Sequence, residues 1–306
     1  MDALADILKT IRLHTTAYFC SDFSSSWGIQ VDTSSNGLFH VLMEGDAWLQ
    51  ANNQASPIKL KPGDIIAFPT GGAHWISDEP GSVKLKGSDV VNRIITGDNP
   101  FQAEKSQLKN TLLCGTFNYD SSLKHPFLKA LPCFIHIEAA HYPDLDWLRS
   151  LLGVVAREAR QSNPGSSIVV DRLTEVLFIQ LLRIYMQEHQ HEEGYLIALH
   201  DTKIGKALNL IHNEHNTLCT VNMLADAAAL SRSAFTERFT RLVGESPKSY
   251  LMNWRMQRAK ALLKESNLVM QSIAEQTGYS SEAAFSKAFK QMFNISPGAF
   301  RKHSEP

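Results

Sequence analysis

The chain has 306 residues, of which 43% are hydrophobic and 20% are charged, with 30 Lys and Arg against 31 Asp and Glu. This composition supplies enough apolar side chains for about two packed domains and excludes a disordered or fibrous chain. No apolar run approaches the ~18 residues of a membrane span, so no membrane partner is expected. The opening Met1–Asp6 carries acids where a signal peptide carries basic residues, and the cysteines at 20, 114, 133 and 219 form no disulfide framework. A cytoplasmic protein is expected.

The near-neutral total charge hides an asymmetry between the two parts of the chain. Residues 195–306 contain 14 Lys and Arg against 9 Asp and Glu, whereas residues 1–194 contain 16 against 22. An acidic part followed by a basic part is typical of a regulatory domain joined to a domain that binds a polyanion.

Short apolar segments separated by turns fill the region from residue 27 to 117. The expected strands cover residues 38–43, 47–51, 58–60, 65–69 and 111–117. A turn at Lys61-Pro62-Gly63-Asp64 combines a proline of fixed φ with a permissive glycine. Many short strands at this spacing predict a β-barrel or β-sandwich.

The pattern changes to helical near Pro143. Asp144 is expected to cap a helix that ends at Asn163-Pro164-Gly165, and a second helix is expected from Ser166 to about Ile184. These two helices are either a packing brace or a homodimer interface, because apolar periodicity does not distinguish the two. The polar stretch 189–194 reads as a linker, so the sequence predicts three segments, 1–142, 143–194 and 195–306.

A helix-turn-helix pattern occurs twice in residues 195–306. The segment Leu224–Ser231 aligns with Ile273–Ser280, and a buried-type Phe pair recurs at an offset of 50 residues, at 235 and 239 and again at 285 and 289. The connecting helix, Pro247 to about Glu265, spans ~28 Å at ~1.5 Å per residue. That length is close to the ~34 Å of one DNA turn, so both second helices are expected to enter major grooves on one side of a duplex.

Burial of those phenylalanines predicts which side chains face outward and read DNA bases. The predicted DNA-binding residues are Arg232, Ser233, Thr236, Glu237, Thr240, Glu282, Ala283, Ser286, Lys287 and Lys290. A second group is predicted to contact phosphates: Arg241, Lys248, Arg255, Arg258, Lys260 and Arg301.

Four segments of residues 195–306 resemble a known family. Ala259-Lys260-Ala261-Leu262-Leu263, Gly278-Tyr279-Ser280-Ser281, Phe285–Phe289 and Ser296–Arg301 resemble the DNA-binding domain of AraC/XylS regulators over about residues 200–302. The resemblance implies promoter DNA as a partner and activation of transcription through RNA polymerase. The sequence departs from the family at Asn294, where a glycine is usual, and at Ala283, where a polar contact residue is usual.

Residues 37–79 resemble a cupin barrel. His40 precedes Glu44-Gly45, and Pro62-Gly63-Asp64 leads to His74 as in the second cupin motif. One alternative is therefore a metal-dependent cupin enzyme that uses His40, Glu44 and His74, with a helical interaction module. Metal-binding cupin enzymes usually have a histidine at the position of Leu38, which disfavours this alternative, so the chain is expected not to be an enzyme.

A second ligand set consists of Cys20, His40, His74 and Cys114. Two thiolates and two imidazoles suit tetrahedral Zn²⁺, and Cys20 and Cys114 are candidate redox residues because thiolates react with oxidants. The same pattern resembles the cupin branch of AraC-type regulators, which includes sensors of reactive chlorine species. Other interpretations keep these groups as inert core residues or place a small organic effector in the barrel, and Cys133 and Cys219 are expected to be packing residues.

The sequence as a whole predicts an α+β multidomain protein. Its N-terminal part, residues 1–142, is a cupin-like β-barrel that senses an oxidant or a small molecule, and residues 143–194 form a helical brace or dimerisation region. Residues 195–306 form an all-α DNA-binding domain with two helix-turn-helix units.

Overall fold

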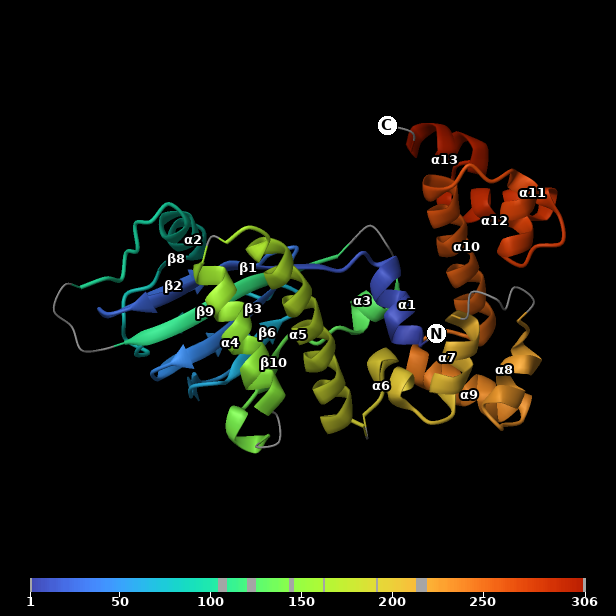
Figure 1. Cartoon of the computed structure of the whole chain (residues 1–306). Coiled ribbons are helices and arrows are strands. Elements are labelled where there is room, and N and C mark those ends of the chain that lie inside the picture. Colours follow the sequence, from blue (N-terminus) through green and yellow to red (C-terminus); the bar gives the residue numbers. More distant parts are fainter. Residues whose placement is uncertain are drawn as a thin grey trace. The chain divides into compact units, whose positions relative to one another are not determined.

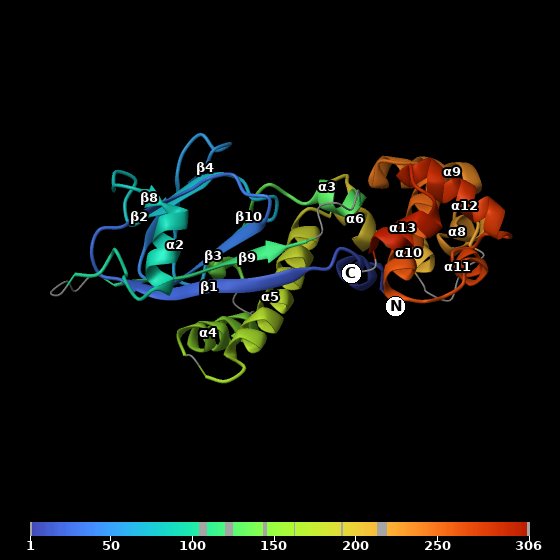
Figure 2. The same cartoon turned by 90° about the horizontal axis from the view of Figure 1, so that it is seen from above.

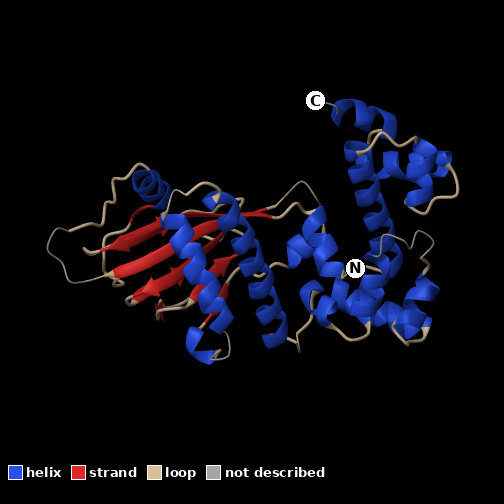
Figure 3. Cartoon of the chain, in the orientation of Figure 1, coloured by secondary structure: helices blue, strands red, loops and turns tan. Residues whose placement is uncertain are grey.

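The computed structural model describes residues 2–103, 109–119, 125–142, 146–161, 163–190, 192–212 and 219–304. The chain divides into two compact units, of which unit 1 contains residues 1–11, 122–130 and 186–306 and unit 2 contains residues 12–121 and 131–185. Strands lie in unit 2 and the described part of unit 1 is helical (Figure 3). The predicted α+β organisation is confirmed. No helix of the described ranges combines the length and apolarity that a bilayer crossing requires.

Unit 2 is built from two five-stranded sheets (Figures 1 and 2). The first has the order β1-β9-β3-β6-β10, with β1 (His14–Phe23), β9 (Asn110–Asn118), β3 (Gly37–Glu44), β6 (Ile65–Phe68) and β10 (Ile135–Ile137). The second has the order β5-β4-β7-β2-β8, with β5 (Ile58–Leu60), β4 (Ala47–Ala51), β7 (His74–Ser77), β2 (Gly28–Val31) and β8 (Leu85–Lys86). Helix α2 (Gly87–Ile95) follows β8, and a 3₁₀ turn covers Ala139–His141.

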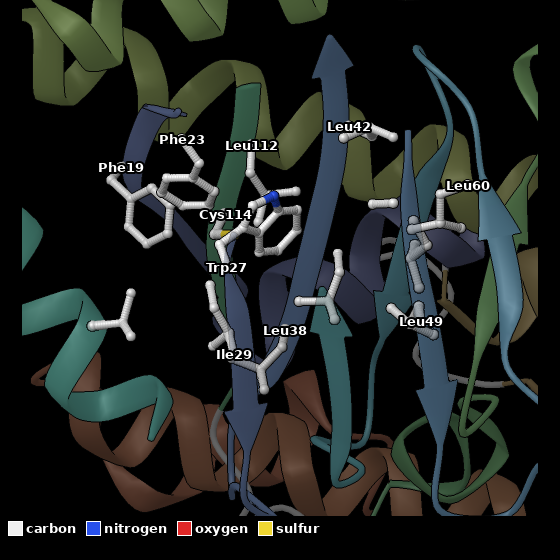
Figure 4. Packing of buried hydrophobic residues seen from close by; sticks show 14 of the residues in the cluster. Phe19, Phe23, Trp27, Ile29, Leu38, Leu42, Leu49, Leu60, Leu112 and Cys114 are labelled. Atoms are coloured by element: carbon white, nitrogen blue, oxygen red, sulfur yellow. The ribbon is translucent and has the colours of Figure 1, made fainter. Parts of the chain in front are cut away.

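The strand predictions at β3, β4, β5, β6 and β9 are confirmed, whereas β1, β2, β7, β10 and α2 were not predicted. The inner faces of the two sheets enclose a core of apolar side chains (Figure 4). Phe23 and Trp27 pack with ring centroids 5.0 Å apart, and both are buried. Alternation along each strand sends every second side chain into this core.

Helices α4 (Asp146–Arg160) and α5 (Ser166–Glu188) belong largely to unit 2 and pack as a brace. Leu152 and Val155 of α4 are buried, and Phe178 of α5 packs on Phe117 of β9 with ring centroids 4.5 Å apart. The homodimer interpretation stays a prediction, since α5 also exposes Ile168 and Val169. The predicted cap Asp144 lies outside the described residues.

Unit 1 contains α1 (Ala3–Thr10), α3 (Pro126–Ala130), α6 (Tyr195–His200) and α7 (Ile204–His212). The first helix-turn-helix consists of α8 (Val221–Ala227) and α9 (Arg232–Val243), and α10 (Pro247–Glu265) leads to the second, α11 (Met270–Gln276) and α12 (Glu282–Phe293), with α13 (Pro297–Ser304) after it. The predicted bounds of α10 agree with the structure. The predicted segment 1–142 included α1 and residues 125–130, but both pack in unit 1, where the apolar face of α1 and the side chain of Phe127 are buried.

Ser231 and Ser281 cap α9 and α12, each accepting a hydrogen bond from the backbone N–H three residues later. At the ends of these helices, Gly244 and Asn294 both adopt the left-handed conformation, with φ of 85° and 59°. Asparagine tolerates this conformation better than other non-glycine residues, which explains why Asn294 replaces the usual glycine.

In the first helix-turn-helix, Ala229 occupies the left-handed turn position, φ 52°, that Gly278 fills in the second. We expect Ala229→Gly to raise the free energy of unfolding by about 0.5–1 kcal/mol, because an L side chain is strained there. Urea titration followed by circular dichroism measures this. The control is Ala228→Gly, since Ala228 is buried at φ −78° and its replacement should destabilise. Equal losses in both variants would contradict the strain at residue 229.

Candidate nucleic-acid interface and barrel cavity

The recognition helices α9 and α12 bury equivalent faces. Phe235 and Phe239 of α9, like Phe285 and Phe289 of α12, have no exposed surface. Within each pair the ring centroids lie 5.4 and 5.8 Å apart. Because residues four apart share one face of a helix, the opposite face of each recognition helix points to solvent.

The predicted base-reading residues occupy that solvent face. Eight of them are exposed, and Thr236 and Ser286 are half-buried. On α9, five of the predicted residues and Arg241 line one open hollow: Arg232, Ser233, Thr236, Glu237 and Thr240. On α12 the exposed residues are Glu282, Ala283, Lys287 and Lys290. Both faces are therefore free to enter a DNA groove.

Several of the predicted phosphate contacts have internal partners: Arg241 pairs with Glu193 (3.4 Å), and Arg255 and Arg301 bond to backbone carbonyls. The guanidinium of Arg255 donates to the carbonyl of Cys219 (3.0 Å), and that of Arg301 donates to the carbonyl of Leu268 (2.6 Å). Both residues thus fasten loop backbone to a helix, a role that charge alone did not reveal. Lys248 is exposed at the start of α10 and remains a candidate.

Unit 2 contains a cavity of about 400 Å³ between its sheets and α2. Apolar side chains form much of its wall: Phe19, Ile29, Leu38, Val90 and Val91. His40 and Cys114 also line it, and the charged lining residues Asp32 and Lys86 are exposed. A volume of this size suits a small organic molecule. Sequence reasoning missed the contribution of α2, because β-branched valines in a short helix give no strong signal.

His40, His74 and Cys114 meet beside this cavity. His40 on β3 lies opposite Cys114 on β9 in the strand register, and its Nδ1 lies 2.9 Å from Sγ of Cys114. Its Nε2 lies 2.8 Å from Nε2 of His74 on β7, so the pair joins the two sheets. His74 stacks on Phe68 with ring centroids 3.8 Å apart.

These contacts determine where the protons lie. Nδ1 of His74 is 2.8 Å from the carbonyl oxygen of Gly72, which only accepts, so His74 donates there and its Nε2 is an acceptor. His40 therefore donates from Nε2 to His74 and accepts at Nδ1 from the thiol of Cys114. The three side chains form one directed chain of hydrogen bonds in which every member is neutral.

Burial keeps these groups uncharged. It lowers the pKa of His74 to about 4 and holds the pKa of His40 well below its usual value. Burial also raises the pKa of Cys114 well above that of a free thiol, and Figure 4 shows Cys114 among the labelled core residues Phe19, Phe23 and Leu112. A protonated, buried thiol is a slow nucleophile.

Cys20 does not join this group. It pairs with Leu113 in the register, whereas Phe19 pairs with Cys114, so Cys20 and Cys114 point to opposite faces of the sheet. On the outer face, Arg160 of α4 donates from Nε to Sγ of Cys20 (3.3 Å) and bonds to Asp22. Burial raises the pKa of Cys20, and the Arg160 guanidinium opposes that rise.

The residues present do not fit the predicted four-ligand zinc site. Cys20 is on the wrong face of the sheet, and His40 offers different ring nitrogens to His74 and Cys114, so one ion does not reach all four. Across the described ranges, no three His, Cys, Asp or Glu side chains form a group suited to a metal ion. The strand alternation that separates the cysteines depends on the register of β1, which the sequence did not reveal.

Two further expectations are corrected. Glu44, the carboxylate of the alternative enzyme site, is exposed and pairs with Lys109 (3.0 Å) instead of joining His40 and His74. Cys133 is exposed and is not a packing residue, whereas Cys219 is buried as expected.

The fold and its exposed helices define a DNA-binding protein with a sheet-rich partner domain, and comparison with known proteins gives the same class. Residues 2–187 match the cupin family model, and residues 224–303 match the model of a helix-turn-helix domain. The HTH-type transcriptional regulator AlkR of Acinetobacter baylyi is 32% identical over 99% of this chain and 100% of AlkR. The RCS-specific HTH-type transcriptional activator RclR of Escherichia coli is 25% identical over 99% of this chain and 98% of RclR.

Among solved structures, the DNA-binding domain of AdpA in complex with a target DNA is 27% identical, covering 32% of this chain and 91% of that chain, with a TM-score of 0.30. The chain belongs to the AraC family of helix-turn-helix transcription regulators that carry a cupin domain. It is a DNA-binding transcription regulator. RNA polymerase contact and homodimer formation stay predictions.

We expect the stability of unit 2 to fall as the pH drops from about 6.5 towards 4. Unfolded His74 binds a proton below its ordinary pKa near 6.5, whereas folded His74 resists until about 4. In this window each such histidine costs about 1.4 kcal/mol per pH unit. Urea unfolding at pH 7, 6 and 5 measures the slope, and His74→Gln should reduce it by about that amount. An unchanged slope in the variant would contradict a neutral buried His74.

We expect Lys287→Ala to weaken binding to an operator selected from random duplexes by about 1–3 kcal/mol, with altered base preference at one position if Lys287 reads a base. A uniform loss with a smaller salt dependence would indicate a phosphate contact. Fluorescence anisotropy at several salt concentrations measures both quantities. Lys206→Ala on α7, which removes an exposed charge outside the recognition helices, is the matched control. No change with Lys287→Ala would contradict the placement of α12 in a groove.

Proposed function

We propose that this regulator responds to a small, largely apolar effector bound in the barrel cavity and activates transcription when the effector is bound. The observation that supports this proposal is the half-open cavity of about 400 Å³ with a largely apolar wall, in which His40 and Cys114 supply neutral polar groups. Apolar walls with a few placed polar groups are typical of small-molecule sites.

The chemistry of the wall indicates which effectors are favoured. His40 and Cys114 are neutral, and the charged lining residues Asp32 and Lys86 are exposed. An ion placed deep in the cavity would lose its hydration without gaining a charged partner. A neutral apolar body with at most one polar group near the exposed residues is therefore favoured.

The second candidate function is oxidant sensing at Cys20. Arg160 within 3.3 Å of Sγ favours the thiolate, which makes Cys20 the better nucleophile of the two predicted redox residues. Hypochlorite would transfer its oxygen to the sulfur, which is oxidised by two electrons to a sulfenic acid, and the chlorine would leave as chloride. A disulfide with Cys114 would require β1 to rearrange, because the two side chains lie on opposite faces. The name of RclR refers to RCS, which makes this candidate worth a direct test.

We expect the uncharged fluorescent dye N-phenyl-1-naphthylamine to bind unit 2 and Val90→Trp to weaken that binding about tenfold or more, because the indole fills the cavity. The matched control is Val83→Trp, since Val83 is 81% exposed and does not line the cavity. Fluorescence titration of the full chain measures both variants.

Equal dye binding by both variants would contradict the cavity as the effector site. Elemental analysis in parallel should find zinc well below one ion per chain. One zinc per chain that is lost in His74→Gln would replace this proposal with the metal site. A hypochlorite response of a promoter reporter that disappears in Cys20→Ser but persists in Val90→Trp would favour the second candidate.

A further inference from the structure

Helix α1 packs into the DNA-binding unit although it precedes the sheet domain in the sequence. Its apolar face is buried in unit 1: Ala3, Leu4, Ile7, Leu8 and Ile11. The backbone N–H of Ala3 donates to Oδ1 of Asn209 on α7 (2.7 Å), and Ala5 and Lys9 lie on the exposed side. The face of α1 is thus complementary to the DNA-binding unit.

A buried polar chain starts at Asp6 on the same face of α1. Oδ2 of Asp6 lies 3.3 Å from Nδ1 of His212 on α7, and Nε2 of His212 lies 2.8 Å from the hydroxyl of Tyr250 on α10. The hydroxyl of Tyr250 in turn bonds to that of Tyr195 on α6. Asp6 is 8% exposed, and the other three are 2% exposed or less, so water contributes little to satisfying these groups.

Asp6 determines which group donates and which accepts in each hydrogen bond of this polar chain. A carboxylate accepts hydrogen bonds, so His212 donates to it from Nδ1. Burial lowers the pKa of His212, which leaves the ring neutral and Nε2 free to accept from Tyr250. The oxygen of Tyr250 then accepts from the hydroxyl of Tyr195. Loss of the Asp6 acceptor would leave a buried donor unpaired or force the ring into the other tautomer.

The hydrogen-bond chain from Asp6 reaches a residue that packs against the buried face of the first recognition helix, α9. The ring of Tyr250 packs edge-on against Phe239 of α9, with centroids 5.7 Å apart. His212 also contacts Trp254 of α10, with centroids 3.9 Å apart. The position of Tyr250 on α10 therefore bears on how α9 is held.

A second segment from outside residues 195–306 closes the same core. His125, immediately before α3, packs its ring edge-on against Tyr195, Tyr250 and Trp254, with centroids 5.6, 6.3 and 6.2 Å away. Its Nδ1 accepts from the backbone N–H of Phe127 (3.1 Å), and its buried Nε2 has no hydrogen-bond partner within the described ranges. His125 is therefore held by ring packing.

We infer that α1 and the segment 125–130 are working parts of the DNA-binding half, and that Asp6 is a positioning residue that orients recognition helix α9 through His212 and Tyr250. This inference concerns DNA binding itself and does not depend on the effector proposal. Helix α1 thus binds the DNA-binding core of its own chain through its apolar face and through the carboxylate of Asp6, which only accepts hydrogen bonds.

The test compares Asp6→Leu with Asp6→Asn in the full chain. Asp6→Leu removes the oxygen that accepts from His212. We expect operator affinity to fall about tenfold, which corresponds to one unpaired buried donor, Nδ1 of His212. Asn keeps an oxygen in the same place and should stay within about twofold of the parent, since its oxygen still accepts from His212. Ala5→Leu, on the exposed side of α1, is the matched control and should bind as the parent does.

Hydroxyl-radical footprinting separates positioning from general destabilisation. The half-site read by α9 is first identified as the one whose protection is lost in Arg232→Ala. Asp6→Leu should lose protection at that half-site and retain it at the α12 half-site, at equal active fractions. Equal loss at both half-sites, or parent-like binding by Asp6→Leu, would overturn the inference. A variant too unstable for footprinting is replaced by Tyr250→Phe, which removes the donor to His212 and should give the same asymmetric footprint.

Discussion

Burial of two phenylalanine pairs is the constraint on which the DNA-binding half depends. Phe235 with Phe239 and Phe285 with Phe289 are fully buried, and each such side chain contributes about 1.5–3 kcal/mol relative to an exposed one. Turning either recognition helix inward would expose these rings. The polar faces of α9 and α12 are therefore held in solvent, where a groove of DNA is accessible to them.

In the sheet domain, the hydrogen bond between His40 and His74 has a comparable role. It joins β3 of one sheet to β7 of the other at 2.8 Å through two buried side chains. A neutral, fully paired polar chain is tolerated in such a core, whereas an unpaired group there would cost about 1–3 kcal/mol. The same pairing uses both nitrogens of His40, which is why histidines spaced like metal ligands do not assemble the predicted zinc site with Cys20.

The two compact units do not follow the order of the sequence. Asp6 and His125 belong to the acidic part of the chain, yet both are buried in the core that supports α9 and α10. Residues that contact neither DNA nor effector thus bear on how the recognition helix is held. A DNA-binding half defined from residue 195 onward would lack the acceptor that fixes the hydrogen-bond chain through His212 and Tyr250.

The sequence by itself determined the features that repeat locally. The offset of 50 residues between the Phe pairs, the caps Ser231 and Ser281, and the limits of α10 follow from helix periodicity and end signals, and the strands around His40 and Cys114 from turn residues. The tertiary structure decided which side chains meet. The register of β1 separates Cys20 from Cys114, and the docking of α1 brings Asp6 to His212, because contacts between distant segments depend on register and packing that no local pattern encodes.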